Sequence, residues 1–264
     1  MPLTDYQAEL ARLLASNRSE DSHLAGGAAL HIEPNSLRYS NDLDYFHDSQ
    51  ERVARAYQDD SSLLEKNGYK VVIEMAQPGY VRARVAKKKE VTKIEWAHDS
   101  AWRFLPVLRD SRCGFLLHPI DLAVNKVLTL AGRNEPRDLV DTIHAHKSIL
   151  PLGALCWAGA GKDPGFNPRS LLELLKRRGR FQKEDLEKLE LKEQIDLPQL
   201  KAEWLKGIED AELFINQRPA DEVGCLYYSL AGKAFFAPPS QAVRRKDYEL
   251  HFGKPGGLIP QFTE

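Results

Sequence analysis

The chain has 264 residues, 28% of them charged and 42% hydrophobic, and its formal net charge is −1. This length can bury the core of one large domain or two smaller ones, and the near-neutral charge by itself does not point to nucleic acid or an anionic membrane as a partner. The amino terminus lacks a signal-peptide pattern, and no segment approaches the roughly 20 apolar residues of a membrane span. We therefore expect a cytoplasmic protein with no membrane partner.

The three cysteines do not suggest a metal site. Cys113, Cys156 and Cys225 are far apart and lack the paired spacing of zinc ligands. We expect reduced, inert thiols.

The first half of the chain alternates between helical and strand patterns. Short turns join the last three expected strands, so these strands should pair antiparallel. The pattern predicts an α+β fold, with helices packed on a mixed sheet. We expect three helices: one that ends near Asn17, one from Gly26 to near Pro34, and one over 53–64 that Gly68 terminates. The expected strands are 37–46, 69–75, 81–85 and 91–96.

The pattern becomes helical after Leu116. Gly159 to Pro168 is rich in glycine and proline, which predicts a linker or exposed loop, and Gly224 to Leu230 predicts a strand or buried segment. We expect one domain over residues 1–115 and a mainly helical domain over residues 116–264. The helices expected in the second domain run from Pro119 to about Arg133, from Arg137 onward, and over 170–178, 183–191 and 197–214.

A glycine pair followed by an Asp-x-Asp forms the first candidate site. Gly26 and Gly27 stand at an expected helix start, where free N–H groups favour phosphate and glycine permits close approach. Asp42 and Asp44 alternate with Leu43, so both carboxylates should project from one face of a strand. Such a pair can hold Mg²⁺ shared with substrate phosphates, which favours nucleotide chemistry.

Two more polar residues extend this face. Arg38 and Ser40 precede the aspartates at alternate positions, so the expected strand carries Arg, Ser, Asp and Asp on one side. A face without apolar residues lines a cleft or meets solvent, and the glycine pair favours the cleft.

The second candidate site lies in the helical half. Lys126 stands among apolar residues, so it either extends to the surface or is held for an anion, and Arg133 falls seven residues later. Asp138 and Asp141 begin the next expected helix, where stabilising the helix dipole is the alternative role.

Together these motifs resemble the nucleotidyltransferase toxins of the abortive-infection AbiEii/AbiGii family. The resemblance covers about residues 20 to 147. It rests on Gly-Gly-Ala-Ala-Leu at 26–30, Arg-Tyr-Ser-Asn-Asp-Leu-Asp at 38–44, Asp-Leu-Ala-x-x-Lys at 121–126 and Arg-Asp-Leu-x-Asp at 137–141.

The resemblance implies a polymerase-beta-like nucleotidyltransferase fold and assigns roles to the matching residues. Asp42 and Asp44 match the metal-binding carboxylates, Gly26, Gly27 and Ser40 match nucleotide-binding positions, and Lys126 and Asp138 match a later lysine and aspartate linked with activity. Residues 1–115 would then be the nucleotidyltransferase domain, with Lys126 and Asp138 contributed by the second domain.

The sequence departs from the family pattern at two places. Ala28 replaces the Thr or Ser that often follows the glycine pair, so a phosphate contact there must come from backbone N–H groups. The third metal carboxylate of this fold sits on a later central strand, where Glu95 is the natural candidate. Glu95 shares its expected strand face with Lys93, opposite Ile94 and Trp96, and such a pair is also common on ordinary solvated surface.

The resulting hypothesis is Mg²⁺-dependent (or Mn²⁺-dependent) transfer of a nucleoside monophosphate from a nucleoside triphosphate. Asp42, Asp44 and Glu95 would bind metal, Arg38 would join the nucleotide-binding residues, and Lys126 with Arg133 would stabilise the departing phosphates. Glu95 or Asp138 could instead take the acceptor proton.

RNA, tRNA above all, is the favoured acceptor, because the resembling toxins include enzymes that modify tRNA. A protein or small-molecule acceptor stays open, and a toxin would have a cognate antitoxin. Two basic segments could serve RNA, although such runs are also common on plain surface: Arg82, Arg84, Lys87, Lys88, Lys89 and Lys93, and residues 176–180. The alternatives are an inactive nucleotidyltransferase fold that binds RNA or protein, and a purely structural protein.

Overall fold

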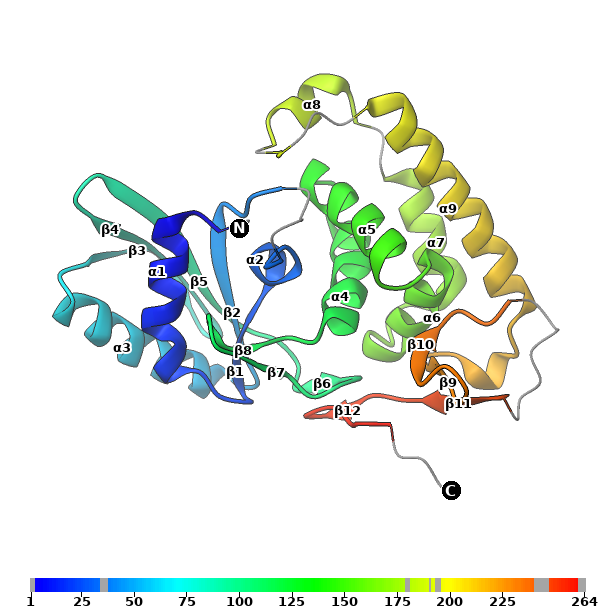
Figure 1. Ribbon diagram of the computed structural model, residues 1–264, viewed down its shortest axis with the longest axis horizontal. Helices are drawn as coiled ribbons and strands as arrows, with labels where there is room; N and C mark the ends of the chain where they lie inside the picture. Colours follow the sequence, from blue (N-terminus) through cyan, green and yellow to red (C-terminus); the bar gives the residue numbers. More distant parts are fainter. Residues whose placement is uncertain are drawn as a thin grey trace. The chain divides into compact units, whose positions relative to one another are not determined.

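The computed structural model describes residues 3–33, 38–178, 181–189, 191–192, 196–239 and 247–260 (Figure 1). The chain divides into two compact units. The first contains Met1–His118 together with Glu190–Lys192 and Pro255–Gly257, and the second contains Pro119–Leu189, Glu193–Lys254 and Leu258–Glu264. No helix among the described residues is both long enough and apolar enough to cross a bilayer.

A seven-stranded mixed sheet forms the first unit, in the order β3-β4-β5-β2-β1-β8-β7 (Figure 1). The central strand β2 pairs parallel with β5 and antiparallel with β1, while β3, β4 and β5 form an antiparallel meander. The expected α+β mixed sheet is therefore confirmed. Its strands are β1 (Ser22–Ala25), β2 (Asp42–His47), β3 (Lys70–Gln77), β4 (Tyr80–Lys87), β5 (Glu90–His98), β7 (Leu108–Asp110) and β8 (Gly114–Leu116).

Alternation along the central strands places one set of side chains in the core. Leu43 and Tyr45 of β2 and Ile94 and Trp96 of β5 are fully buried. Their chain neighbours at the intervening positions project from the opposite face, which is partly open. The two principal helices of this unit are α1 (Asp5–Leu14), followed by the short η1 (Ala15–Asn17), and α3 (Gln50–Lys66).

A buried polar network anchors the core beneath the sheet. Asp60 of α3 forms an ion pair with Arg18, accepts a hydrogen bond of 2.7 Å from Trp96 Nε1 and accepts another of 2.9 Å from Asn17. The side chains of Arg18 and Asp60 are both inaccessible to solvent. This network fixes Trp96, and with it the position of β5.

The strand predicted over 37–46 begins only at Asp42. Arg38 forms an isolated bridge with Leu191, and the Ser40 hydroxyl donates to the Asp42 carbonyl at 3.0 Å. A side chain that bonds to nearby backbone competes with a strand ladder, so Arg38 and Ser40 are not members of the strand face predicted for them. Leu37 and the expected end of the second helix near Pro34 lie outside the described residues, and that helix, α2, covers Gly26–Leu30.

The predicted antiparallel hairpins are confirmed. Pro78 and Gly79 join β3 to β4, with Gly79 at φ +74°, and Lys88 and Lys89 join β4 to β5. Gly68 ends α3 in a left-handed conformation at φ +79°, as its position after the helix predicted.

Helices make up most of the second unit. The helices α4 to α9 are followed by η2 and by a three-stranded antiparallel sheet in the order β10-β9-β11, which confirms the strand expected near Gly224 to Leu230. The short strands β6 (Trp102–Arg103) and β12 (Lys254–Pro255) pair with each other, and β6 and Pro255 belong to the first unit. The elements are α4 (Pro119–Gly132), α5 (Pro136–Ser148), α6 (Leu152–Lys162), α7 (Pro168–Arg177), α8 (Lys183–Glu187), α9 (Leu197–Gln217), η2 (Ala220–Glu222), β9 (Leu226–Ser229), β10 (Ala234–Phe236) and β11 (Tyr248–His251).

The linker or exposed loop predicted from Gly159 to Pro168 is confirmed only for residues 163–167, and its predicted start at Gly159 was wrong. Residues up to Lys162 belong to α6, in which Gly159 and Ala160 are buried. A Cβ added at Gly161 would lie 2.3 Å from the carbonyl oxygen of Gly224, so glycine here permits close backbone packing. The composition that suggested a loop therefore serves a tight contact.

All three cysteines are free and buried. Burial raises the pKa of the Cys113 and Cys225 thiols to about 12, so they stay protonated at neutral pH. The expectation of free thiols is therefore confirmed among the described residues.

Candidate active site

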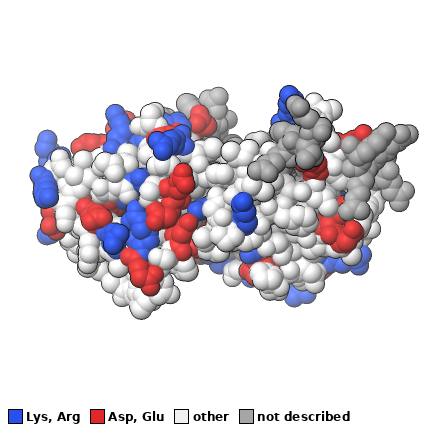
Figure 2. Space-filling model, turned by 90° about the horizontal axis from the view of Figure 1, so that it is seen from below, with Lys and Arg blue, Asp and Glu red and all other residues white. Residues whose placement is uncertain are grey.

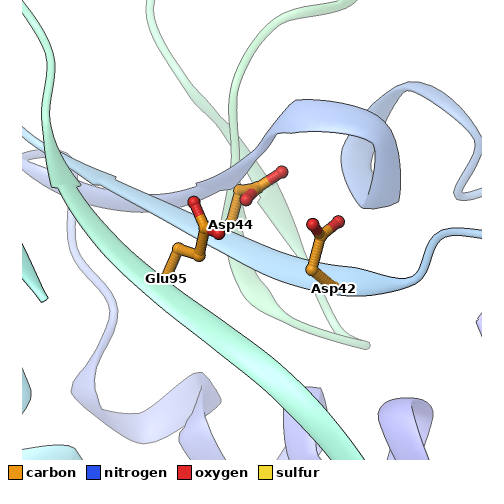
Figure 3. A group of neighbouring side chains, drawn as sticks. All are labelled: Asp42, Asp44 and Glu95. Carbon is orange, nitrogen blue, oxygen red and sulfur yellow. The ribbon is translucent and has the colours of Figure 1, made fainter. Parts of the chain in front are cut away.

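Three carboxylates from two neighbouring parallel strands converge on the open face of the sheet (Figure 3). Asp42 and Asp44 come from β2 and Glu95 from β5, and Asp44 stands directly opposite Glu95 in the ladder. One oxygen from each carboxylate lies within 4.8 Å of the other two, and all three residues are partly buried. We call these residues the acidic triad.

Asp42 is positioned by hydrogen bonds from the chain segment that precedes it. The Ser40 hydroxyl lies 3.3 Å from Asp42 Oδ1 and also donates to the Asp42 carbonyl. The Ser40 carbonyl in turn accepts a 2.9 Å hydrogen bond from Gln7 Nε2, and the same amide lies 3.3 Å from the Thr92 hydroxyl on β5. Gln7 is buried and links α1, the approach to β2, and β5.

Glu95 is held by its neighbours on β4. Arg82 Nε donates to Glu95 Oε1 at 2.8 Å, and both side chains are partly exposed. Burial, followed by the hydrogen bond and the negative charge of Glu95, raises the pKa of Tyr80 to about 12, so the phenol is a neutral donor beside this carboxylate. Arg82 and Tyr80 therefore fix the third carboxylate and partly offset its charge.

The two glycines lie against this cluster. Gly26 has φ +62°, and a Cβ added there would be 1.8 Å from Asp44 Oδ2. A Cβ at Gly27 would be 2.7 Å from Arg38 Nη2 and 3.2 Å from the Ser40 hydroxyl. Only glycine at position 26 combines this backbone conformation with this proximity to Asp44.

The structure thus brings seven of the predicted site residues together in the first unit. They are Gly26, Gly27, Arg38, Ser40, Asp42, Asp44 and Glu95. The donor set is three carboxylates, and hard oxygen ligands of this kind suit Mg²⁺ or Mn²⁺.

The other predicted site residues lie in the second unit and form two ion pairs there. Lys126 Nζ of α4 is 2.8 Å from Asp141 Oδ2 of α5, and both side chains are buried. Arg133 pairs with Asp138 through two contacts of 2.6 and 3.2 Å, with the Asp138 side chain buried and that of Arg133 half exposed. Lys126 therefore neither extends freely to the surface nor lacks a counter-ion.

Four cations of the predicted basic segments pair with acidic side chains among the described residues. Arg82 pairs with Glu95, Arg84 with Glu74, Lys87 with Glu9, and Lys176 with Glu173 and Glu212. The end of the second segment, residues 179–180, lies outside the described residues. On the face in Figure 2, basic and acidic side chains are interspersed rather than separated into patches of one sign.

The supporting residues Gln7 and Tyr80 are not indicated by the sequence pattern. Gln7 is the third residue after Thr4, the N-cap of α1, and it completes a capping box with that threonine. That pattern predicts a capping role, whereas the contact with Ser40 depends on packing across 33 residues of sequence. Tyr80 lies at a hairpin turn, where no local signal indicates a partner on β5.

Comparison with solved structures reveals a similar fold. The chain aligns with the nucleotidyltransferase toxin MenT4 from Mycobacterium tuberculosis at a TM-score of 0.54 and 16% identity, covering 82% of this chain and 83% of that one. The fold is nucleotidyltransferase-like.

Two further structures, a candidate nucleotidyltransferase from Helicobacter pylori and JHP933 from the same species, align at a TM-score of 0.48 and 17% identity. They cover 80% and 81% of this chain and 94% and 95% of theirs. No protein-family model matches the sequence, and no curated protein matches it.

Proposed function

We propose that this protein is a metal-dependent nucleotidyltransferase that transfers a nucleoside monophosphate from a nucleoside triphosphate to an acceptor. The observation that carries the proposal is the acidic triad, with oxygens within 4.8 Å of one another on a nucleotidyltransferase-like sheet. Three carboxylates held so close together repel one another unless a cation or protons offset their charge. A divalent cation supplies that charge and also binds phosphate oxygens.

In the first unit, some residues would bind the metal or the nucleotide, and others would position the binding residues. Asp42, Asp44 and Glu95 would hold Mg²⁺ or Mn²⁺, which when bound neutralises phosphate charge. Gly26 and Gly27 would let the triphosphate approach backbone N–H groups, with Arg38 as a nearby cation, and Ser40 would position Asp42. In the transfer, an acceptor oxygen or nitrogen bonds to the α-phosphorus, the bond from this phosphorus to the bridging oxygen breaks, and pyrophosphate leaves.

We assign supporting roles to residues of the second unit. Lys126 and Arg133 would stabilise negative charge on the leaving pyrophosphate, and Asp138 would hold Arg133 or accept the acceptor's proton. In this proposal the second domain contributes to catalysis at the triad of the first, with the domain boundary near residue 115.

We further propose that the acceptor is RNA, tRNA above all, and that the protein is a toxin of the AbiEii/AbiGii type with a cognate antitoxin, acting in the cytoplasm. The toxin role is supported by the motifs at 26–30, 38–44 and 121–141 and by the fold shared with a structure described as a nucleotidyltransferase toxin.

A second function, an inactive nucleotidyltransferase fold that binds RNA or protein, is favoured by one observation. Arg82, Lys126 and Arg133 already form ion pairs with Glu95, Asp141 and Asp138. A site whose cations are engaged by its own carboxylates would bind a nucleotide only after those pairs rearrange. Nucleotide binding without turnover, unchanged in Asp44→Ala, would support this function.

The test incubates purified protein with Mg²⁺ or Mn²⁺, each α-labelled nucleoside triphosphate in turn, and total RNA or lysate. We expect label on RNA with the native protein, none with Asp42→Asn/Asp44→Asn, and undiminished label with Asp59→Asn. Asp59 is an exposed carboxylate on α3, so its variant controls for loss of charge alone. No label on any acceptor from any donor, with all variants folded, would contradict transfer. Label on a protein band would support transfer and reject the RNA acceptor.

A further inference from the structure

The strand β3 forms an open edge of the seven-stranded sheet (Figure 1). Among the described residues, β3 pairs only with β4, although it is eight residues long. Seven of its eight residues are exposed, and three of them are large and apolar: Val72, Ile73 and Met75, at 46%, 50% and 47%. A long edge strand with apolar side chains is a template for pairing with another strand.

The sequence of this edge is complementary to itself. Lys70-Val71-Val72-Ile73-Glu74 carries a positive charge at one end, a negative charge at the other, and three β-branched residues between them. If two copies pair antiparallel about Val72, Lys70 of each lies opposite Glu74 of the other, and Val71 lies opposite Ile73. Opposite charges and β-branched side chains in these positions both favour strand pairing.

The geometry of the strand limits this pairing to a short stretch. The register between β3 and β4 shifts between Ile73 and Met75, which makes Glu74 the extra residue of a β-bulge. A bulge interrupts regular pairing and twists the strand, so the regular part of the edge is residues 70–73, which contains Val72, and Glu74 lies at its end. The Glu74 carboxylate accepts from Arg84 Nε at 2.7 Å, which holds it on the face that Val72 and Arg84 share.

We propose that the edge of β3 is a self-association surface, at which two copies of this chain pair antiparallel through a two-fold axis at Val72. The contact is isologous, so each copy contributes the same residues and the assembly closes as a dimer. Because this contact is smaller than a standard interface, the dimer is weak, and its share of the protein rises with concentration. This self-association does not depend on nucleotidyl transfer.

Pairing about Val72 predicts a specific disulfide. Cα atoms directly opposite in an antiparallel pair are about 4.5 or 5.5 Å apart, within the range that a disulfide bridges. Val72→Cys should therefore cross-link to itself under mild oxidation. Met75→Cys is the matched control, because Met75 is equally exposed on the same strand but would lie about 20 Å from its own copy at ~3.3 Å per residue. The three native cysteines are buried and give a low background.

The experiment follows disulfide dimers of both variants on non-reducing gels, and self-association of the parent chain by sedimentation. We expect the Val72→Cys variant to cross-link at least tenfold faster than the Met75→Cys variant. Cross-linking of Val72→Cys no faster than that of Met75→Cys overturns the proposal. A dimer in which neither variant cross-links overturns it as well, because that dimer would use another surface.

A charge test separates this register from other edge contacts. Lys70→Glu and Glu74→Lys each place like charges opposite each other in a homodimer, so each should weaken self-association about tenfold or more. A mixture of the two variants restores both opposite-charge pairs and should form a heterodimer. Equal association in the separate and mixed samples would overturn this register.

Discussion

Replacing Gly26 with alanine tests whether the glycine beside Asp44 is required by the acidic triad. Gly26 combines a left-handed backbone conformation at φ +62° with a Cβ position that falls on the Asp44 carboxylate. Gly68 is the matched control, because its φ of +79° is also left-handed but no atom lies within 4 Å of its Cβ position. Both alanine variants carry backbone strain, whereas only Gly26→Ala also displaces a proposed metal ligand.

The expected magnitudes follow from these contacts. An alanine in the left-handed region costs about 1–2 kcal/mol, and a less flexible unfolded chain offsets about 0.4–1 kcal/mol, so Gly68→Ala should lower the free energy of unfolding by about 1 kcal/mol. Overpacking against Asp44 adds about 1–3 kcal/mol, which gives a total of about 2–4 kcal/mol for Gly26→Ala. Displacing the Asp44 carboxylate by about 1 Å should lower transfer activity about 100-fold.

The assay measures urea unfolding by tryptophan fluorescence, Mn²⁺ affinity by calorimetry, and transfer of labelled nucleotide. We expect Gly68→Ala to keep native Mn²⁺ affinity and activity, and Gly26→Ala to lose both while remaining folded. The reasoning is refuted if both variants bind Mn²⁺ equally well, because the alanine at position 26 would then leave Asp44 in place. Calorimetry gives this answer whether or not the protein transfers nucleotides.

Three further predictions concern buried charge. Asp60→Ala leaves Arg18 buried without its ion-pair partner and should lower the free energy of unfolding by about 3–5 kcal/mol, measured in urea. Asp141→Ala should lower the free energy of unfolding by a similar amount, because it leaves Lys126 buried without its ion-pair partner, whereas Lys126→Met/Asp141→Leu should recover most of this stability. Equal stability of the two variants would argue against a buried ion pair. Burial, aided by the charge of Arg18, lowers the pKa of His47 to about 2. Below about pH 6.5 the unfolded chain therefore binds a proton at His47 that the folded protein does not, so the free energy of unfolding decreases as pH falls. Going from about pH 7 to about pH 5 should cost about 2 kcal/mol through His47, and a native-like pH slope in His47→Phe would contradict this.

The aspartates and the core of the sheet could be predicted from local pattern. Alternation in 42–45 and 93–96 determines which side chains face the helices, and the structure confirms that Leu43, Ile94 and Trp96 are buried. The proximity of Glu95 to Asp44 is a different kind of fact, because it depends on β2 and β5 being parallel neighbours. No local rule fixes which strands of a sheet are adjacent, so Glu95 could be named only through the family resemblance.

Two errors have physical explanations that involve distant residues. The strand predicted over 37–46 begins only at Asp42, because Ser40 bonds to nearby backbone and Arg38 pairs with Leu191, more than 150 residues away. Residues 159–162, the last turn of α6, were predicted as part of a loop because of their glycines, one of which serves the contact between Gly161 and Gly224. In both cases a tertiary partner decides the local structure, and the sequence around the site carries no signal of it.

The parallel register of β2 and β5 makes the alignment of the acidic triad depend on the hydrophobic core. Asp44 faces Glu95 only because Tyr45 faces Trp96 one step further along the ladder. A shift of β5 by one residue would place Ile94 or Trp96 opposite Asp44, where the carboxylate of Glu95 is needed. The same shift would turn the polar side chains of β5 into the core. Trp96 is in turn fastened by Asp60 on the far side of the sheet. Mutations that never touch the carboxylates could therefore erase the site by changing its alignment, and variation among homologues should be constrained at these buried positions as strictly as at the acidic ones.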